Sequence, residues 1–244
     1  MKFYLCIDRG NSRTKVSLFR DNELLETVCS SALNQVDFSV LLGGRVADAA
    51  IFSGVAGDDS EAYGLLADKA ARIVNVKEVK ALPIRVDYKS PETLGSDRIA
   101  TAVGAADAFP GRNVLVVDAG SALTIDLVTG DGAFVGGRIS PGMMMRFRAL
   151  HQLTGRLPMA TADGDIPSEG YDTKSSIRAG VVRGIAGEIS SAVKHYGDAM
   201  PGLEVLITGG DAAFLSSYVN ENITLDENLL AKGLNRILLY NENI

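Results

Sequence analysis

Short apolar runs alternate with stretches of helical spacing along this chain of 244 residues. Apolar runs bounded by turn residues are typical of strands, which we expect at 3–8, 15–19, 49–56, 114–117, 123–128 and 204–208. Apolar side chains that recur every three or four positions predict helices at 60–74, 97–109, 141–153 and 176–196, and another after Gly209-Gly210. Strands alternating with helices in this way predict an α/β fold.

The first strand and its turn have a counterpart in the second half of the chain. The first strand ends in Asp8, small polar residues turn the chain at 10–12, and a second strand follows. The second half likewise has a strand that ends in Asp118, a turn of small residues at 119–121 and a returning strand. We interpret this recurrence as a duplicated α/β unit, with a cleft between two similar halves and a boundary near Pro110-Gly111.

Composition and charge restrict the class of function. A formal net charge of −6 argues against a general nucleic-acid binder, because neutralising phosphates requires clustered Lys and Arg. Two cysteines provide neither a disulfide framework nor a zinc site. The apolar start of the chain is too short for a signal peptide, and no apolar run reaches the ~20 residues of a membrane span. We expect a cytoplasmic protein that binds neither nucleic acid nor membrane.

The two Asp-x-Gly turns indicate phosphate chemistry. The chain has no P-loop, no dinucleotide-binding glycine fingerprint and no His-Glu-x-x-His motif. Small residues in tight turns let backbone N–H groups approach phosphate oxygens, and a carboxylate at each turn can hold a divalent cation. Gly209-Gly210 would let a flat adenine ring lie close to the backbone. Nearby side chains add neutral donors and one positive charge: Asn11, Ser12, Lys15, Ser121 and Thr124.

Phosphoryl transfer also needs a group that orients the acceptor hydroxyl. Asp97 and Arg98 follow Gly95 at the start of a predicted helix, where unpaired N–H groups and the helix dipole favour an anionic substrate. Asp97 could accept the hydroxyl proton while Arg98 pairs with the substrate. The alternative is that Ser96 or Asp97 only caps the helix, since both are favoured N-cap types.

Five ordered motifs resemble those of the type III pantothenate kinases, members of the actin/hexokinase/acetate-kinase-like superfamily. They are DRGNSRTK (8–15), YKSPETLGSDR (88–98), DAGSALT (118–124), GGRISPG (136–142) and DTKSSIRAG (172–180). The resemblance implies a duplicated ribonuclease-H-like (actin-like ATPase) fold, with one such domain at 1–110 and another at 111–244. It also implies the ATP-dependent phosphorylation of pantothenate to 4′-phosphopantothenate, the first step of coenzyme A biosynthesis.

The resemblance assigns roles to individual residues. Asp97 would be the general base, and Asp118 would bind a monovalent cation, K⁺ or NH₄⁺, while Mg²⁺ accompanies the nucleotide. ATP would contact Asp8, Arg9, Gly10, Asn11, Ser12, Arg13, Thr14, Lys15 and Ser121. Pantothenate would contact Tyr88, Gly95, Ser96, Asp97, Arg98 and Thr173. Since the Thr173 region of this family comes from the neighbouring subunit, the resemblance implies a homodimer.

The chain departs from the family pattern at Arg9, Ser12, Ser121 and Ser176. Two other functions stay open at this point. One is a non-catalytic, ATP-binding regulatory module on the same fold, and the other is a kinase of the same superfamily with another substrate. Retention of the acidic and basic motif residues favours an enzyme, and the Gly-Ser-Asp-Arg segment at 95–98 favours pantothenate.

Overall fold

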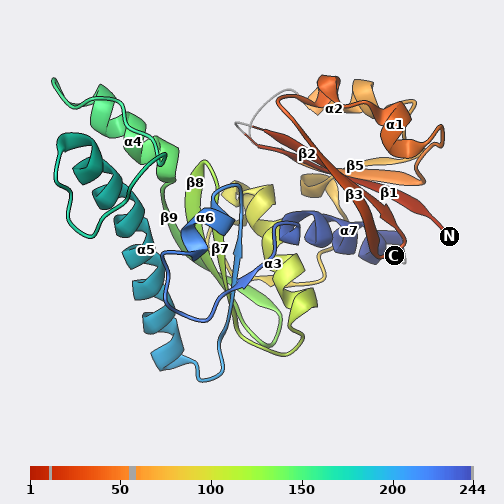
Figure 1. The fold of residues 1–244 in the computed structure, drawn as a ribbon. Helices are drawn as coiled ribbons and strands as arrows, with labels where there is room; N and C mark the ends of the chain where they lie inside the picture. Colours follow the sequence, from red (N-terminus) through yellow and green to blue (C-terminus); the bar gives the residue numbers. More distant parts are fainter. Residues whose placement is uncertain (11–12, 55–58, 243–244) are drawn as a thin grey trace. The chain divides into compact units, whose positions relative to one another are not determined.

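The computed structural model describes residues 1–10, 13–54 and 59–242, which form two compact units (Figure 1). The first unit comprises Met1–Pro110, Asp131–Phe134 and Asn228–Ile244, and the second comprises Gly111–Gly130 and Val135–Glu227. The C-terminal segment therefore groups with the first unit by its contacts. Two ribonuclease-H-like domains bounded at 1–110 and 111–244, with a cleft between them, stay a prediction.

The first unit is built on a five-stranded sheet with the order β3-β2-β1-β4-β5. Its strands are β1 (Phe3–Arg9), β2 (Thr14–Arg20), β3 (Glu23–Ser30), β4 (Ala49–Gly54) and β5 (Ile73–Asn75). The predicted hairpin of β1 and β2 is confirmed, and β1 also pairs in parallel with β4. Side chains alternate between the faces of a strand, so Leu5 and Ile7 lie in the core with the first helices, whereas Asp8 points to the opposite face.

The described residues of the first unit form four α-helices: α1 (Phe38–Leu42), α2 (Asp59–Leu66), α3 (Ser96–Ala108) and α7 (Leu229–Glu242). Figure 1 shows α1 and α2 on one face of the first sheet and α7 on the other. The predicted helix at 60–74 is wrong beyond Leu66. Ala70 forms an isolated bridge with Ala47, and the β-branched Ile73 and Val74 pair in parallel with β4 as β5. Pairing with a strand distant in the sequence overrides the local helical spacing.

The second unit contains most of a six-stranded sheet with the order β11-β10-β7-β8-β9-β6. Its strands are β7 (Val114–Ala119), β8 (Ala122–Val128), β9 (Ala133–Pro141), β10 (Glu204–Thr208), β11 (Thr224–Leu225) and β6 (Arg85–Val86). β6 pairs with Ala133 and Phe134, the residues of β9 that belong to the first unit.

The two sheets repeat one topology. The central strand, β1 or β7, pairs antiparallel with the strand that follows it and parallel with β4 or β10. The outer strand, β5 or β11, then pairs in parallel with β4 or β10. The α/β class and the duplication predicted from the two Asp-x-Gly turns are confirmed.

Three α-helices lie in the second unit: α4 (Met143–Gln152), α5 (Thr173–Ala199) and α6 (Ala212–Ser216). Helix α5 begins earlier than predicted because Asp172 and Ser175 form a capping box at its start. In α4, Met143 and Phe147 are buried, whereas Met144 is exposed. None of the helices in the described ranges combines the length and apolar character needed to cross a membrane.

Helices α3 and α7 pack closely in the first unit because glycines line their contact. A Cβ atom on Gly233 would lie 1.8 Å from the carbonyl oxygen of Ala100, and one on Gly104 would lie 2.5 Å from that of Leu229. No other residue fits these positions without separating the helices. This contact holds the start of α3, where Asp97 lies, against the C-terminal helix.

Candidate active site

Asp8 lies at the carboxyl end of β1, where three neighbouring strands bring polar side chains together. The register places Ser53 of β4 and Lys15 of β2 opposite Asp8. The hydroxyl of Ser53 donates a hydrogen bond to Asp8 Oδ1 at 3.1 Å. β1 and β4 are parallel, so their carboxyl ends meet at one edge of the sheet, where ligands of α/β proteins commonly bind.

The Asp8 carboxyl is electrostatically coupled to Asp97. Burial raises the pKa of Asp8 to about 6, against the lowering effect of the Ser53 hydrogen bond. The negative charge of Asp97 raises this pKa further, and the positive charge of Lys15 lowers it. Two carboxylates and a lysine thus lie within electrostatic reach in the first unit, where a bound cation would favour the ionised form of Asp8.

Helix α3 begins beside the end of β4. Ser96 is buried, and its hydroxyl oxygen accepts a hydrogen bond from the backbone N–H of Gly54 at 3.3 Å. The N-cap residue is Gly95, and no side chain caps the helix. The prediction that Ser96 or Asp97 is the N-cap residue is therefore wrong, although Asp97 accepts a hydrogen bond from the backbone N–H of Arg98 in the first turn. The side chain of Ser96 joins the helix to the sheet instead.

The Asp97 carboxylate is held over Gly95. Asp97 Oδ1 accepts a hydrogen bond from the backbone N–H of Arg98 at 2.8 Å. A Cβ atom on Gly95 would lie 2.3 Å from the same oxygen, so only glycine leaves room for the carboxylate in this position. The geometry therefore explains why glycine precedes this aspartate by two residues.

Arg98 is buried against two aromatic rings. Its guanidinium carbon lies 5.6 Å from the ring centroid of Tyr88 and 5.4 Å from that of Phe134. The two rings contact each other edge to face, with centroids 5.8 Å apart. Sequence reasoning named Tyr88 and Arg98 but missed Phe134, whose only signal is its place just before the Gly-Gly of 136–142.

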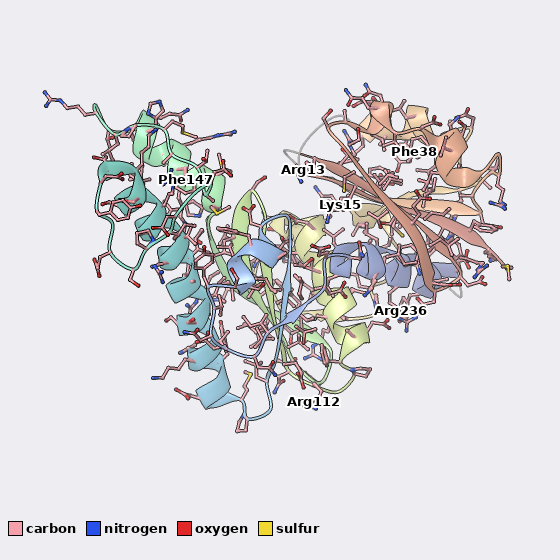
Figure 2. All side chains as sticks on the ribbon, viewed as in Figure 1. Arg13, Lys15, Phe38, Arg112, Phe147 and Arg236 are labelled. Atoms are coloured by element: carbon pink, nitrogen blue, oxygen red, sulfur yellow. The ribbon has the colours of Figure 1, made fainter. Side chains whose placement is uncertain are left out.

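The turn between β1 and β2 is described at its two ends. The N–H of Gly10 donates to the carbonyl oxygen of Arg13 at 3.0 Å, and Figure 2 shows Arg13 and Lys15 at this end of the hairpin. Asn11 and Ser12 lie outside the described residues. The Arg9 guanidinium faces the acidic start of α2, 3.7 Å from Asp59 and 3.6 Å from Glu61.

Two of the residues predicted to contact ATP, Arg9 and Thr14, already have surroundings within the fold. The two acidic side chains of α2 partly neutralise the charge of Arg9, and Thr14 is buried at the start of β2. Contacts of either residue with ATP stay predictions.

The matching turn of the second unit surrounds Asp118. The register places Thr124 of β8 and Thr208 of β10 opposite Asp118, as Lys15 and Ser53 lie opposite Asp8. Gly209 follows β10 with φ +101°, and a Cβ atom there would lie 2.5 Å from both Asp118 Oδ1 and the carbonyl oxygen of Ala119. A carboxylate and a carbonyl oxygen therefore converge beside Gly209, and both are ligand types for hard cations.

The segment 136–142 supports this second turn. The N–H of Gly142 donates to the carbonyl oxygen of Ser121 at 3.2 Å. A Cβ atom on Gly142 would lie 2.2 Å from the carbonyl oxygen of Gly120 and 2.5 Å from that of Ser121. Arg146 of α4 then fixes the segment by donating to the carbonyl oxygen of Pro141 at 2.7 Å. The Pro-Gly motif therefore positions the Asp118–Ser121 turn.

Thr173 lies in the second unit, at the exposed start of α5. It borders an open surface depression of about 450 Å³ whose lining combines apolar side chains with two hydroxyls. The lining residues are Leu150, Leu157, Thr173, Ser176, Ile177 and Gly180. Among the described residues there is no cluster of three or more His, Cys, Asp or Glu side chains that could hold a metal ion alone.

Comparison with known proteins decides the family. Residues 4–195 match the family model of the type III pantothenate kinases. This chain belongs to the type III pantothenate kinase family. It is 38% identical to the type III pantothenate kinase of Phocaeicola vulgatus, over 98% of this chain and 99% of that protein. It is 39% identical to that of Bacteroides fragilis, over 97% and 98%.

Solved structures confirm the fold. A conserved Campylobacter jejuni protein assigned to the Baf family of transcriptional activators matches 98% of this chain and 100% of its own, with a TM-score of 0.64 and 22% identity. A glucokinase from an Antarctic psychrotroph matches both chains fully, with a TM-score of 0.52 and 8% identity. These similarities support the actin-like ATPase fold, and membership in the type III pantothenate kinase family makes this chain a kinase.

The structure brings most of the predicted site residues of the first unit together. Those placed at the ends of β1 and β2, at the start of α3 or against Arg98 are Asp8, Lys15, Tyr88, Gly95, Ser96, Asp97 and Arg98. Asp118, Ser121 and Thr173 lie in the second unit. Sequence reasoning missed Ser53 and Gly54, because a small residue at the end of a strand carries no local signal.

Proposed function

We propose that this type III pantothenate kinase transfers the γ-phosphoryl group of ATP to the hydroxyl of pantothenate, with Asp97 as the general base. The observation that carries the assignment is the Asp97 carboxylate, held over Gly95 at the start of α3 and within electrostatic reach of Asp8. A kinase base must have a fixed position, and positive charge must lie near the phosphate that it serves. The Arg98 N–H fixes the carboxylate of Asp97, and the positive charge comes from Lys15 and from the N-terminal end of the α3 dipole.

The chemistry assigned to Asp97 is a proton transfer. The carboxylate accepts the proton of the substrate hydroxyl while that oxygen forms a bond to the γ-phosphorus of ATP. The bond between the γ-phosphorus and the bridging oxygen breaks, and ADP leaves. The hydrogen bond from the Arg98 N–H to Asp97 Oδ1 orients the carboxylate, which leaves Oδ2 to receive the proton.

We assign the nucleotide to the turn at 8–15 and to the turn at Ser121. Asp8, with the Ser53 hydroxyl beside it, fits a Mg²⁺ ion, because Mg²⁺ in kinases takes one or two carboxylates together with phosphate oxygens. When bound, Mg²⁺ neutralises charge on the β- and γ-phosphates. Lys15 lies opposite Asp8 and supplies a positive charge near the same phosphates.

We assign a monovalent cation, K⁺ or NH₄⁺, to Asp118. The Asp118 carboxylate and the Ala119 carbonyl converge beside Gly209, and oxygen ligands of this kind suit a hard monovalent ion. The assignment predicts that activity depends on the identity of the monovalent cation.

We assign Arg98 to bind the carboxylate of pantothenate. We assign Tyr88, Gly95 and Ser96 to line the rest of the pantothenate site. Thr173 of a second subunit completes the site in this proposal, which makes the enzyme a homodimer. Apolar side chains exposed on the second unit support an interface that involves this unit. They are Ile139, Met144, Met145, Leu153 and Tyr171.

We place the reaction in the cytoplasm. Cys6 and Cys29 are both thiols, which suits a reducing compartment. The placement is tested by fractionating cells that express the chain with a C-terminal tag.

ADP release with ATP, Mg²⁺ and pantothenate, measured first in potassium and then in sodium salts, tests the proposal. We expect release that depends on pantothenate and is faster in potassium, with 4′-phosphopantothenate as the product by mass spectrometry. Equal rates in the two salts would contradict the cation assignment alone. ADP release that does not depend on pantothenate would contradict the assignment of pantothenate as the substrate.

Sedimentation of the purified chain tests the homodimer. We expect a dimer for the unchanged protein and dissociation for Leu153→Glu, since Leu153 is 84% exposed and a charge there would be buried in the interface. Val40→Glu is the matched control, because Val40 is also exposed (73%) but belongs to the first unit. A monomer in the unchanged protein at the enzyme's working concentration would contradict the assignment of Thr173.

A further inference from the structure

Phe134 is a buried aromatic residue that none of the five family motifs includes. It lies near the start of β9 with an exposed fraction of 0%. Its carbonyl oxygen accepts a hydrogen bond from the N–H of Asp87 at 2.8 Å, and Val86 lies opposite it in the parallel β6–β9 pairing. This pairing holds Tyr88, the residue after Asp87, beside Phe134, and the planes of the two rings are inclined at 66°.

The guanidinium of Arg98 packs against the faces of both rings. The guanidinium carbon lies over both rings, 5.4 Å from the centroid of Phe134 and 5.6 Å from that of Tyr88. Both distances are within the ~6 Å at which an aromatic face attracts a cation. Arg98 is only 7% exposed, so water screens these contacts little. Two inclined rings restrict both the position and the plane of the guanidinium more than one ring would.

We propose that Phe134 is a positioning residue for the substrate: with Tyr88, its ring fixes the plane of the Arg98 guanidinium for pairing with the pantothenate carboxylate. This inference rests on the proposed function, in which Arg98 binds that carboxylate. A guanidinium donates its hydrogen bonds within its own plane, and a paired contact with a carboxylate requires that plane to be aligned. Ring contacts use the faces of the guanidinium and are compatible with in-plane hydrogen bonds.

Phe134→Leu tests the proposal because leucine keeps an apolar side chain and removes the ring. We expect the KM for pantothenate to rise about tenfold, the size of a desolvated cation–π contact. The KM for ATP and kcat should stay within about twofold, since Phe134 acts only through Arg98. A lower folded fraction would reduce the apparent kcat but leave KM unchanged, so lost stability alone cannot produce this result.

Phe52→Leu is the matched control. Phe52 is also 0% exposed in the first unit, and its ring contacts Tyr63 edge to face with centroids 5.3 Å apart. The variant therefore loses a buried ring and an aromatic pair of the same kind. We expect a similar fall in melting temperature and an unchanged KM for pantothenate. A tenfold rise in this control would show that the effect of Phe134→Leu is a general response to a damaged core.

A double-mutant cycle with Arg98→Lys identifies the route of the effect. Lysine keeps the charge but has no planar guanidinium, so Phe134→Leu should change kcat/KM for pantothenate by less than about twofold in that background. An unchanged KM in Phe134→Leu, or the same tenfold effect in the Arg98→Lys background, would overturn the inference. Phe134→Met, which also fills the space without a ring, replaces Phe134→Leu if that variant does not fold.

The same assays separate this inference from the proposed function. If the unchanged enzyme releases no ADP in response to pantothenate, the proposed function is wrong, and the inference falls with it. If the unchanged enzyme is active and Phe134→Leu keeps its KM, the proposed function stands and only the role of Phe134 is wrong.

Discussion

Gly95→Ala perturbs the position of the Asp97 carboxylate without altering its chemistry. The added Cβ would lie 2.3 Å from Asp97 Oδ1, whereas ordinary van der Waals contact begins at 3.4 Å. The carboxylate oxygen must therefore retreat by about 1 Å. Gly95 has φ −60°, which alanine adopts readily, so the backbone itself is not strained.

The displacement should lower kcat far more than it lowers stability. A catalytic group misplaced by about 1 Å can cost about 100-fold in rate, and kcat of Gly95→Ala should fall by about that factor. Stability should fall by only about 1 kcal/mol, because alanine is a poorer N-cap than glycine and the Arg98 hydrogen bond to Asp97 weakens. The KM for ATP should not change.

Steady-state ADP release and urea denaturation measure these two effects on the same samples. Gly64→Ala in α2 is the matched control, because a Cβ atom there meets nothing within 4 Å. We expect that variant to gain about 0.5–1 kcal/mol of stability and to keep its kcat. A folded Gly95→Ala enzyme with kcat within threefold of the unchanged protein would refute the argument that the position of Asp97 matters for catalysis.

Three further variants test other parts of the structure. The pKa of Asp8 is about 6 in the fold and near 3.8 in the unfolded chain, so the folded state binds this proton more tightly and loses about 3 kcal/mol of stability as the pH rises from 4 through 6. Asp8→Asn should remove this loss, and urea denaturation should find the variant more stable than the unchanged protein at pH 8 but not at pH 4. Gly233→Ala should destabilise the protein by about 2–3 kcal/mol in the same assay, because its Cβ would lie 1.8 Å from the Ala100 carbonyl oxygen; equal stability would contradict the α3–α7 packing. Gly142→Ala should displace the turn at Ser121 and raise the KM for ATP while leaving that for pantothenate unchanged, and a raised KM for pantothenate alone would contradict the nucleotide assignment.

The sequence pattern predicted those parts of the fold in which the interacting residues are close together in the sequence. The hairpin at Asp8 and its repeat at Asp118 were predictable because strand, turn and strand are contiguous in each case. The end of α2 and the start of β5 were not, because Ile73 becomes a strand residue only by pairing with β4. Likewise, no local signal assigns α7 to the first unit, since its packing depends on glycines in helices far apart in the sequence.

The same distinction applies to the residues of the candidate site. Asp97 was predictable because a carboxylate at the start of a helix is visible in the sequence. Ser53 was not, since its role depends on the parallel register that places it opposite Asp8. Phe134 was not predictable either, because only the β6–β9 pairing brings its ring to Arg98. The departure at Arg9 also has a structural explanation, for its guanidinium faces Asp59 and Glu61 on α2.

Transfer of the γ-phosphoryl group by the unchanged enzyme and by Asp97→Asn, measured together with ATP binding to both, tests whether Asp97 is the general base. Asparagine preserves the size of the side chain and can still accept the hydrogen bond from the Arg98 N–H, but it cannot take up a proton. We expect 4′-phosphopantothenate to form at least 100-fold more slowly with Asp97→Asn, and we expect the two proteins to bind ATP with equal affinity. Product formation at the rate of the unchanged enzyme would contradict the assignment of Asp97 as the base.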